Sequence, residues 1–204
     1  MPTTVLLIRH GQTEWNRVER FRGRYDLPLN DTGLQQAQKT AQLVAACWNI
    51  SALYASPLQR AVQTAQAIAD ACHVPVQTAP GLVDIDYGQW QGLSPEEAAA
   101  KWPDLITAWR YRPQEVHIPG GETLGVVRRR AFNTLKNLCH RHLDQHIALV
   151  SHTVVNRLLL MSVLNINTQL FWHLHQEPCA VNIIQYSEKG FSLVSMNDTC
   201  HLRE

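Results

Sequence analysis

Residues 5–11 read Val-Leu-Leu-Ile-Arg-His-Gly, an apolar run that stops abruptly at a cation and an imidazole. A continuous run of aliphatic residues is typical of a strand buried on both faces of a parallel sheet. Arg9 and His10 therefore fall at the carboxyl end of a buried strand, where open α/β sheets bind ligands. Gly11 lets the backbone come close to a bound group. The stretch predicts an α/β fold with a binding site at this edge.

The composition fits one soluble domain spanning residues 1–204. Hydrophobic residues make up 45% of the chain and charged residues 17%, which is enough for a substantial core. The net charge of +1 predicts no strong attraction to nucleic acid or to a membrane. No apolar run is long enough to span a bilayer, and the amino terminus lacks a signal-peptide pattern. We therefore expect a cytoplasmic protein.

The five cysteines are odd in number, widely spaced and without a Cys-x-x-Cys pair. This argues against a disulfide framework and against a zinc site. We expect free, mostly buried thiols, and neither a metal nor a cofactor. The residues concerned are Cys47, Cys72, Cys139, Cys179 and Cys200.

The remaining chain alternates short apolar runs with helical periodicity, which predicts a parallel sheet with right-handed crossovers. The segment 94–119, which begins with Ser-Pro, is expected to be a helical insertion over the carboxyl edge of the sheet. A short glycine-containing connection near the end of the chain predicts a hairpin. The predicted strands are 50–55, 74–76, 147–150, 180–186 and 191–196; the predicted helices are 34–46, one after Ser56-Pro57 with Pro57 in its first turn, 123–142 and 154–164.

Arg60 is a candidate anion ligand, because it follows Ser56-Pro57-Leu58-Gln59 at a predicted helix start. A guanidinium presents a planar fork that matches phosphate oxygens, and a helix amino terminus adds free N–H groups. The alternative is a solvated arginine on an exposed face.

His152 is the second candidate histidine, because residues 147–152 repeat the opening pattern of a buried strand that ends in His. A single histidine there is more often structural. Two strands that each end in His at one sheet edge are harder to explain by packing alone. One neutral imidazole could act as a nucleophile, and the other, if protonated, could help to bind phosphate.

These segments, with Gln-Thr-Glu-Trp-Asn after Gly11, resemble the histidine phosphatase superfamily, the phosphoglycerate mutase-like enzymes. The resemblance runs in order to about Thr153. It implies a three-layer α/β/α sandwich with a mostly parallel central sheet. It also implies a phosphohistidine intermediate on His10 without a metal, with Arg9, Arg60 and His152 holding the phosphoryl oxygens.

The segment 82–92 resembles the acid-bearing loop of this family. Aligned on its Gly-x-Trp-x-Gly frame, the family's proton donor falls on Asp84, where Glu is more usual. Aspartate is one methylene shorter, so Asp86 is the reserve candidate. The chemistry needs a carboxyl that is protonated near an anion and gives its proton to the leaving alkoxide. The alternative is a pair of solvated loop carboxylates.

Other substrate ligands follow from the same resemblance. Asn16 could donate to a phosphate oxygen. Arg22 stands where the family commonly has Gln, adding a cation at the rim or merely a solvated arginine. Thr153 replaces the usual Gly, and its N–H or hydroxyl could still reach phosphate. Residues 120–123, Gly-Gly-Glu-Thr, resemble a supporting Gly-Gly-Glu-Ser element.

The sequence thus predicts a metal-independent phosphomonoester hydrolase for a small phosphorylated metabolite, with no nucleic-acid or membrane partner; a homodimer is compatible with it. A phosphoglycerate mutase is the alternative, disfavoured by the short chain and by the absence of Arg between Asp84 and Tyr87. A non-catalytic phosphate- or protein-binding module is the alternative from another class. The substrate stays open among phosphoserine, α-ribazole phosphate, sugar phosphates and a broad range.

Overall fold

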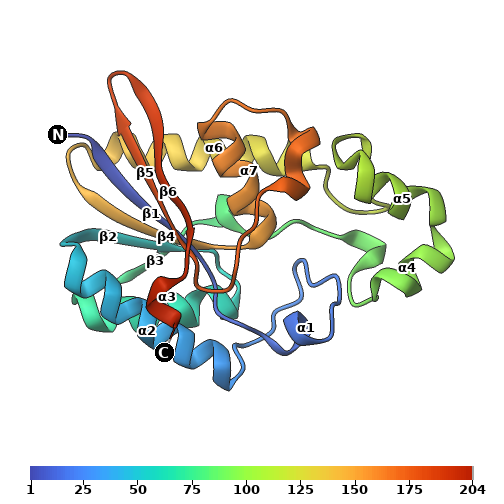
Figure 1. The fold of residues 1–204 in the computed structure, drawn as a ribbon, viewed down its shortest axis with the longest axis horizontal. Helices are drawn as coiled ribbons and strands as arrows, with labels where there is room; N and C mark the ends of the chain where they lie inside the picture. The colour runs from blue at the N-terminus through green and yellow to red at the C-terminus, as the bar shows by residue number, and fades with distance from the viewer. Residues whose placement is uncertain (204) are drawn as a thin grey trace.

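The opening apolar run forms strand β1 (Thr3–Arg9), whose seven residues are all buried. The computed structural model describes residues 1–203. Within these residues, β1 is one of the inner strands of a six-stranded sheet (Figure 1). The other strands are β2 (Ile50–Ala55), β3 (Val76–Thr78), β4 (His146–Ser151), β5 (Val181–Ser187) and β6 (Gly190–Asp198). Their order across the sheet is β3-β2-β4-β1-β5-β6.

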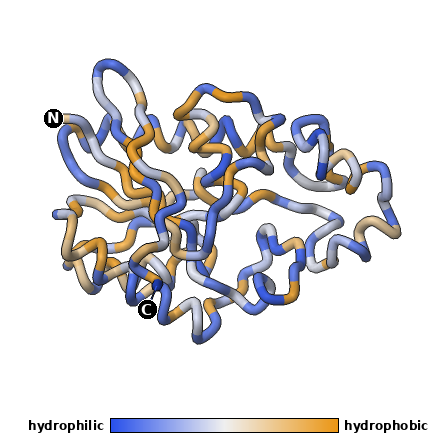
Figure 2. The backbone as a smooth tube through the Cα atoms, in the orientation of Figure 1, coloured by the Kyte–Doolittle hydropathy of each residue, from blue (hydrophilic) through white to orange (hydrophobic). Residues whose placement is uncertain are grey.

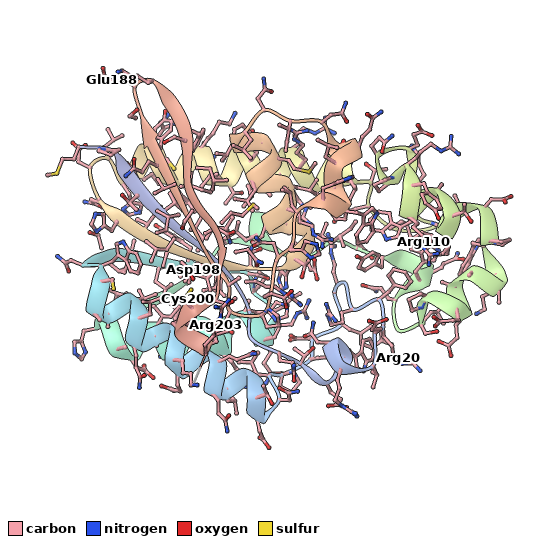
Figure 3. All side chains as sticks on the ribbon, viewed as in Figure 1. Arg20, Arg110, Glu188, Asp198, Cys200 and Arg203 are labelled. Atoms are coloured by element: carbon pink, nitrogen blue, oxygen red, sulfur yellow. The ribbon has the colours of Figure 1, made fainter. Side chains whose placement is uncertain are left out.

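The sheet is mostly parallel, as predicted. Strands β3, β2, β4 and β1 run in one direction, and β5 and β6 run antiparallel to their neighbours. Strands β5 and β6 form the predicted hairpin, and Glu188 marks its tip, which projects from the sheet (Figure 3). The strand predicted at 74–76 is displaced: β3 begins at Val76.

Side chains of β1 point alternately to two separate cores. Val5 and Leu7 pack with the helices α6 (Leu124–Arg141) and α7 (Thr153–Val163), whereas Leu6 and Ile8 pack with α2 (Asp31–Cys47) and α3 (Gln59–Cys72). The helices therefore cover opposite faces of the sheet (Figure 1). Hydrophobic residues are frequent in the strands between the two helical layers (Figure 2). This arrangement is the predicted three-layer α/β/α sandwich.

Helix starts follow the local capping chemistry. The Asn30 side chain accepts from the Gly33 N–H at the start of α2, and Ser94 and Glu97 form a reciprocal capping box at α4 (Pro95–Lys101). Helix α3 begins at Gln59, so Pro57 precedes the helix and the prediction that it lies in the first turn is wrong. The remaining elements are α1 (Glu14–Arg17), α5 (Pro103–Tyr111) and the short 3-10 helices η1 (Pro80–Leu82), η2 (Gly88–Trp90), η3 (Pro113–Glu115), η4 (Thr168–His173) and η5 (Cys200–Leu202).

Two properties of the described chain bear on the sequence predictions. None of the helices within residues 1–203 has the length and apolar character needed to cross a membrane. The five cysteines are free, but only Cys139 and Cys179 are buried, so the expectation of mostly buried thiols is wrong.

Gly11 and Gly33 let the loop after β1 pack directly on the start of α2. A Cβ placed on Gly11 would lie 2.5 Å from the Gly33 carbonyl oxygen, and one placed on Gly33 would clash with the backbone oxygen of Gln12. Asn30 N–H also donates to that Gln12 oxygen, at 3.1 Å. The close backbone contact holds the chain immediately after His10 against the α2 layer.

We expect Gly33→Ala to lower the free energy of unfolding by about 1–3 kcal/mol, because the added methyl forces backbone apart. The control is Gly125→Ala at an exposed position of α6, where the nearest atom to the new Cβ is Thr123 Oγ1 at 3.8 Å. There the gain in helix propensity should stabilise by up to about 1 kcal/mol. Urea unfolding measures both. Equal effects of the two substitutions would contradict this account of the loop.

Candidate active site

Parallel pairing of β1 with β4 brings two histidines together. Arg9 is in register with Ser151, so His10 and His152 leave their strands at the same level. Their ring centroids lie 5.1 Å apart with the planes inclined by 59°. His10 is 1% exposed and His152 is fully buried. The two residues predicted from separate strand ends thus form one site.

The chain leaves these neighbouring strands in opposite directions, to α2 on one face and to α7 on the other. Such a point opens a crevice at the carboxyl edge of a parallel sheet, where ligands bind. His152 is the N-cap residue of α7, and Thr153 is its first residue. The free N–H groups at this helix start favour an anion in the crevice.

His10 is held as one tautomer. Its Nδ1 lies 2.6 Å from the Gly11 carbonyl oxygen, which can only accept, so Nδ1 carries the proton and Nε2 keeps its lone pair. Burial lowers the pKa of His10 well below its ordinary value, and the charges of Arg60 and Arg9 lower it further. The ring is therefore neutral near pH 7, with an unprotonated Nε2.

His152 is oriented by Ser56, a residue to which the sequence analysis assigned no role. Its Nε2 lies 2.7 Å from Ser56 Oγ at the end of β2, and its Nδ1 lies 3.7 Å from Asp84 Oδ2. Burial, followed by the charge of Arg60, lowers the pKa of His152 well below its ordinary value. The sequence places Ser56 directly after a predicted strand, but it does not show that this strand neighbours β4, so the contact could not be predicted.

Arg60 lies in the first turn of α3 and is fully buried, so the alternative of a surface arginine is wrong. It donates to the backbone oxygens of Tyr25 and Gly23, each at 2.8 Å, and to Asp84 Oδ2 at 3.1 Å. These contacts fix the guanidinium beneath the loop 20–25 and beside the candidate acid.

Arg9 and Arg22 add two more cations to the same crevice. Arg9 donates to the Gln176 carbonyl and Arg22 to the Trp15 carbonyl, and neither Nε has a partner among residues 1–203. Burial, with the nearby charge of Arg22, lowers the pKa of Arg9 to about 9. Both arginines line one pocket and keep N–H donors without a protein acceptor among the residues described.

Asp84, and not Asp86, lies with the histidines. Asp84 is 6% exposed, and burial raises its pKa while the charges of Arg60 and Arg22 oppose that rise. Asp86 belongs to a separate polar cluster: its Oδ1 accepts from the Gly88 N–H at 2.8 Å and its Oδ2 lies 3.5 Å from Arg24 Nη1. The Gly-x-Trp-x-Gly frame thus located the carboxyl nearest the histidines.

Asn16 and Thr153 line the same pocket as Arg9, Arg22 and Asp84. Asn16 Oδ1 accepts from the Thr13 N–H and hydroxyl, each at 2.9 Å, so the carbonyl end is fixed and the amide NH2 remains for another acceptor. Thr153 Oγ1 is buried without a hydrogen-bond partner in the described chain.

The pocket has a volume of about 350 Å³. Its lining includes an aromatic and charged wall that the sequence did not predict. Arg157 joins this wall from α7. The other residues come from loops and short turns without periodicity: Phe21, Tyr87, Phe171, Trp172, His175 and Glu177. In the described part of the chain, no residue of the segment 94–119 lines this pocket. Instead Trp109 of α5 packs behind it against Tyr87 and Trp172, and the Trp172 Nε1–H donates to the Trp109 carbonyl at 2.7 Å.

The fold and the paired histidines define a class that sequence comparison names. The sequence profile of the histidine phosphatase superfamily (branch 1) matches residues 5–199, and the chain belongs to this family. Phosphoserine phosphatase 1 of Hydrogenobacter thermophilus is 33% identical over 200 residues, 98% of this chain and 94% of the relative. The metal-independent phosphoserine phosphatase of Arabidopsis thaliana is 30% identical over 202 residues, 98% and 83% of the two chains. The solved structure of Bacillus stearothermophilus YhfR superposes with a TM-score of 0.94 at 26% identity, covering 98% of this chain and all of that one.

The buried histidines should make stability depend on pH. Below its ordinary pKa each histidine takes up a proton in the unfolded chain that the folded protein, with its lowered pKa, does not bind. The free energy of unfolding should therefore fall as the pH drops from about 7 to about 5, by up to roughly 1.4 kcal/mol per pH unit for each group.

Urea unfolding across this pH range measures the slope. His152→Asn should reduce it, whereas His117→Asn, at an exposed position, controls for the loss of a histidine in general. An unchanged slope in the His152 variant would contradict a neutral buried imidazole.

Proposed function

We propose that the protein is a metal-independent phosphomonoester hydrolase that acts on a small phosphorylated metabolite through a phosphohistidine at His10. The observation that carries the proposal is the neutral His10, whose Nε2 is unprotonated beside His152, Arg9 and Arg60. Membership of the histidine phosphatase superfamily and the two relatives named as phosphoserine phosphatases support this activity.

In the first step, His10 Nε2 attacks phosphorus in line. A bond forms between nitrogen and phosphorus, and the ester P–O bond to the leaving group breaks. Arg9, Arg60 and Arg22 offset the charge on the three non-bridging oxygens, with further donors from Asn16 and the start of α7. Because Asp84 occupies Arg60 before substrate binds, the phosphoryl group competes with this carboxyl for the guanidinium.

The leaving alkoxide needs a proton, which Asp84 supplies. A bound phosphate dianion offsets the arginine charges that oppose the raised pKa of Asp84, and so favours the protonated carboxyl. The same dianion favours protonation of His152, which then becomes a donor to the phosphoryl group.

In the second step, water attacks the phosphohistidine. The Asp84 carboxylate takes one proton from the water, the N–P bond breaks, and inorganic phosphate leaves with His10 neutral again. Positive charge comes from arginines throughout, so the proposed steps contain no role for a metal ion.

The pocket favours a compact anionic substrate. It is about 350 Å³ in volume, and Arg9, Arg20, Arg22 and Arg157 outnumber Glu19, Asp84 and Glu177 in its lining. Phosphoserine comes first among the candidates because two relatives carry that name. A panel that also includes α-ribazole phosphate and sugar phosphates, compared by kcat/KM, orders the four substrate possibilities.

Two competing functions are separated by simple assays. A phosphoglycerate mutase would interconvert phosphoglycerate isomers faster than it releases phosphate. A non-catalytic phosphate- or protein-binding module would bind phosphate without hydrolysing a generic aryl phosphate. Both histidines, Arg9, Arg60 and a buried acid lie together at one edge of the sheet, which favours hydrolysis over either.

His10→Ala should abolish phosphate release, because it removes the Nε2 that attacks phosphorus in the proposed first step. The assay is run in the presence of a chelator, with the exposed His140→Ala as the control. Alkaline quenching of the wild type and mass spectrometry should locate phosphate on His10. Turnover by the His10 variant near the wild-type rate would end the proposal, and chelator-dependent loss in the wild type would refute metal independence.

Asp84→Asn should slow hydrolysis of an alkyl phosphate far more than that of p-nitrophenyl phosphate, whose nitrophenolate leaves without a proton. General acid assistance contributes about a hundredfold to ten-thousandfold in rate, and much of that factor should be lost on the alkyl ester. Asp86→Asn is the matched control two residues away. If only the Asp86 variant shows this dependence on the leaving group, then the acid has been assigned to the wrong residue.

A further inference from the structure

The guanidinium group of Arg130, on α6, donates five hydrogen bonds within the protein. The Nε and Nη2 atoms donate to Glu122 Oε1 and Oε2 at 3.0 and 2.9 Å. Its remaining hydrogen bonds go to three backbone carbonyls: Gly81 at 2.9 Å, Val83 at 2.6 Å and Asp84 at 3.0 Å. A guanidinium has five N–H groups, so each one has an acceptor.

The first of these carbonyls lies in the short helix η1, and the other two lie in the irregular segment that follows it and carries Asp84. Such a segment lacks the regular hydrogen bonds of a strand or helix, so its buried carbonyls need other partners. The carbonyl of Leu82 accepts from Ser151 Oγ at 2.8 Å. All four carbonyls from 81 to 84 are therefore held by side chains, and Arg130 holds three of them.

Glu122 extends this anchor to the other side of Asp84. Its Oε2 accepts from the Asp86 N–H at 3.1 Å, and its own N–H donates to the Asp86 carbonyl at 2.8 Å. Oε2 also lies 3.3 Å from Arg24 Nη2. The Arg130–Glu122 pair thus binds the backbone before and after the candidate acid.

We propose that Arg130, held by Glu122, is a positioning residue that places the Asp84 carboxyl for proton transfer to the leaving group. Arg130 is not part of the pocket lining and has no N–H left for a substrate, so it acts through Asp84. The proposal rests on the proposed function, in which Asp84 is the acid. An aspartate reaches less far than a glutamate, so its reach depends on where the backbone is held.

The test substitutes Arg130→Lys, which keeps the charge opposite Glu122 but cannot reach three carbonyls. Its matched control is Arg128→Lys on the same helix, where Arg128 donates to Ser162 Oγ at 2.9 Å and to the Met161 carbonyl at 3.2 Å, and so joins α6 to α7. Both substitutions remove structural hydrogen bonds of a partly buried arginine. Only Arg130, however, is bonded to the segment 81–84 that carries Asp84.

We expect Arg130→Lys to lower kcat on an alkyl phosphate by about tenfold to a hundredfold, and on p-nitrophenyl phosphate much less, because a small displacement of a catalytic group is costly. KM should change little. Arg128→Lys should affect both substrates equally. In the Asp84→Asn background, Arg130→Lys should cause no further loss that depends on the leaving group.

Hydrogen exchange of residues 80–88 gives a readout that is independent of turnover, and should rise in Arg130→Lys but not in Arg128→Lys. Glu122→Gln is a second variant, expected to show the same dependence more weakly if the Arg130 variant does not fold. Equal losses on both substrates, additivity with Asp84→Asn, or unchanged exchange would overturn the proposal. A missing leaving-group effect in Asp84→Asn alone would instead refute the acid of the proposed function.

Discussion

Insertion of β4 between β1 and β2 is the constraint on which the site depends. The His10 N–H donates to the Ser151 carbonyl and the Ser56 N–H to the Val150 carbonyl, each at 2.9 Å, so the backbone just after β1 and β2 is bound to β4. This register places both imidazoles at one height above the sheet. The next helices lie on opposite faces, and a pocket lined by Arg9, Asp84 and Thr153 lies at this edge of the sheet. A shift of one residue in this pairing would turn one imidazole into the core.

Arginines outnumber carboxylates around the site. Arginines and burial keep both histidines neutral, and Asp84 is the carboxyl that pairs with buried Arg60. A buried cation without a full complement of anions is costly, so an incoming phosphate dianion relieves an unfavourable arrangement. The same anion alters the electrostatic balance at Asp84 and His152 in the direction that the proposed chemistry needs. In the proposed mechanism, substrate binding and preparation of Asp84 as the acid are then one electrostatic event.

Local sequence patterns predicted those features that local chemistry determines. The apolar runs located β1 and β4 with the histidines at their ends, helical periodicity located α2 and α6 to within about three residues at each end, and the Gly-x-Trp-x-Gly frame pointed to Asp84. The order of strands was not predictable, since alternating strands and helices do not say that β4 inserts between β1 and β2. The aromatic wall from Phe171 and Trp172 also escaped prediction, because η4 and the chain after it lack a period. The five hydrogen bonds of Arg130 join residues 8 to 49 positions apart along the chain, and no pattern in its own helix indicates them.

Ser151 links the two halves of the chemistry. Its backbone pairs with Arg9 in the sheet, its carbonyl accepts from the His10 N–H, and its hydroxyl donates to the Leu82 carbonyl in the acid loop. One residue therefore fixes the loop that carries Asp84 to the strand pair that carries His10. Arg130 ties the same loop to α6, on the α6–α7 face of the sheet. With its backbone held from two directions, a short carboxyl side chain can lie within 3.1 Å of Arg60 and 3.7 Å of His152. The reach that a longer glutamate would supply by its side chain is supplied here by the placement of the loop.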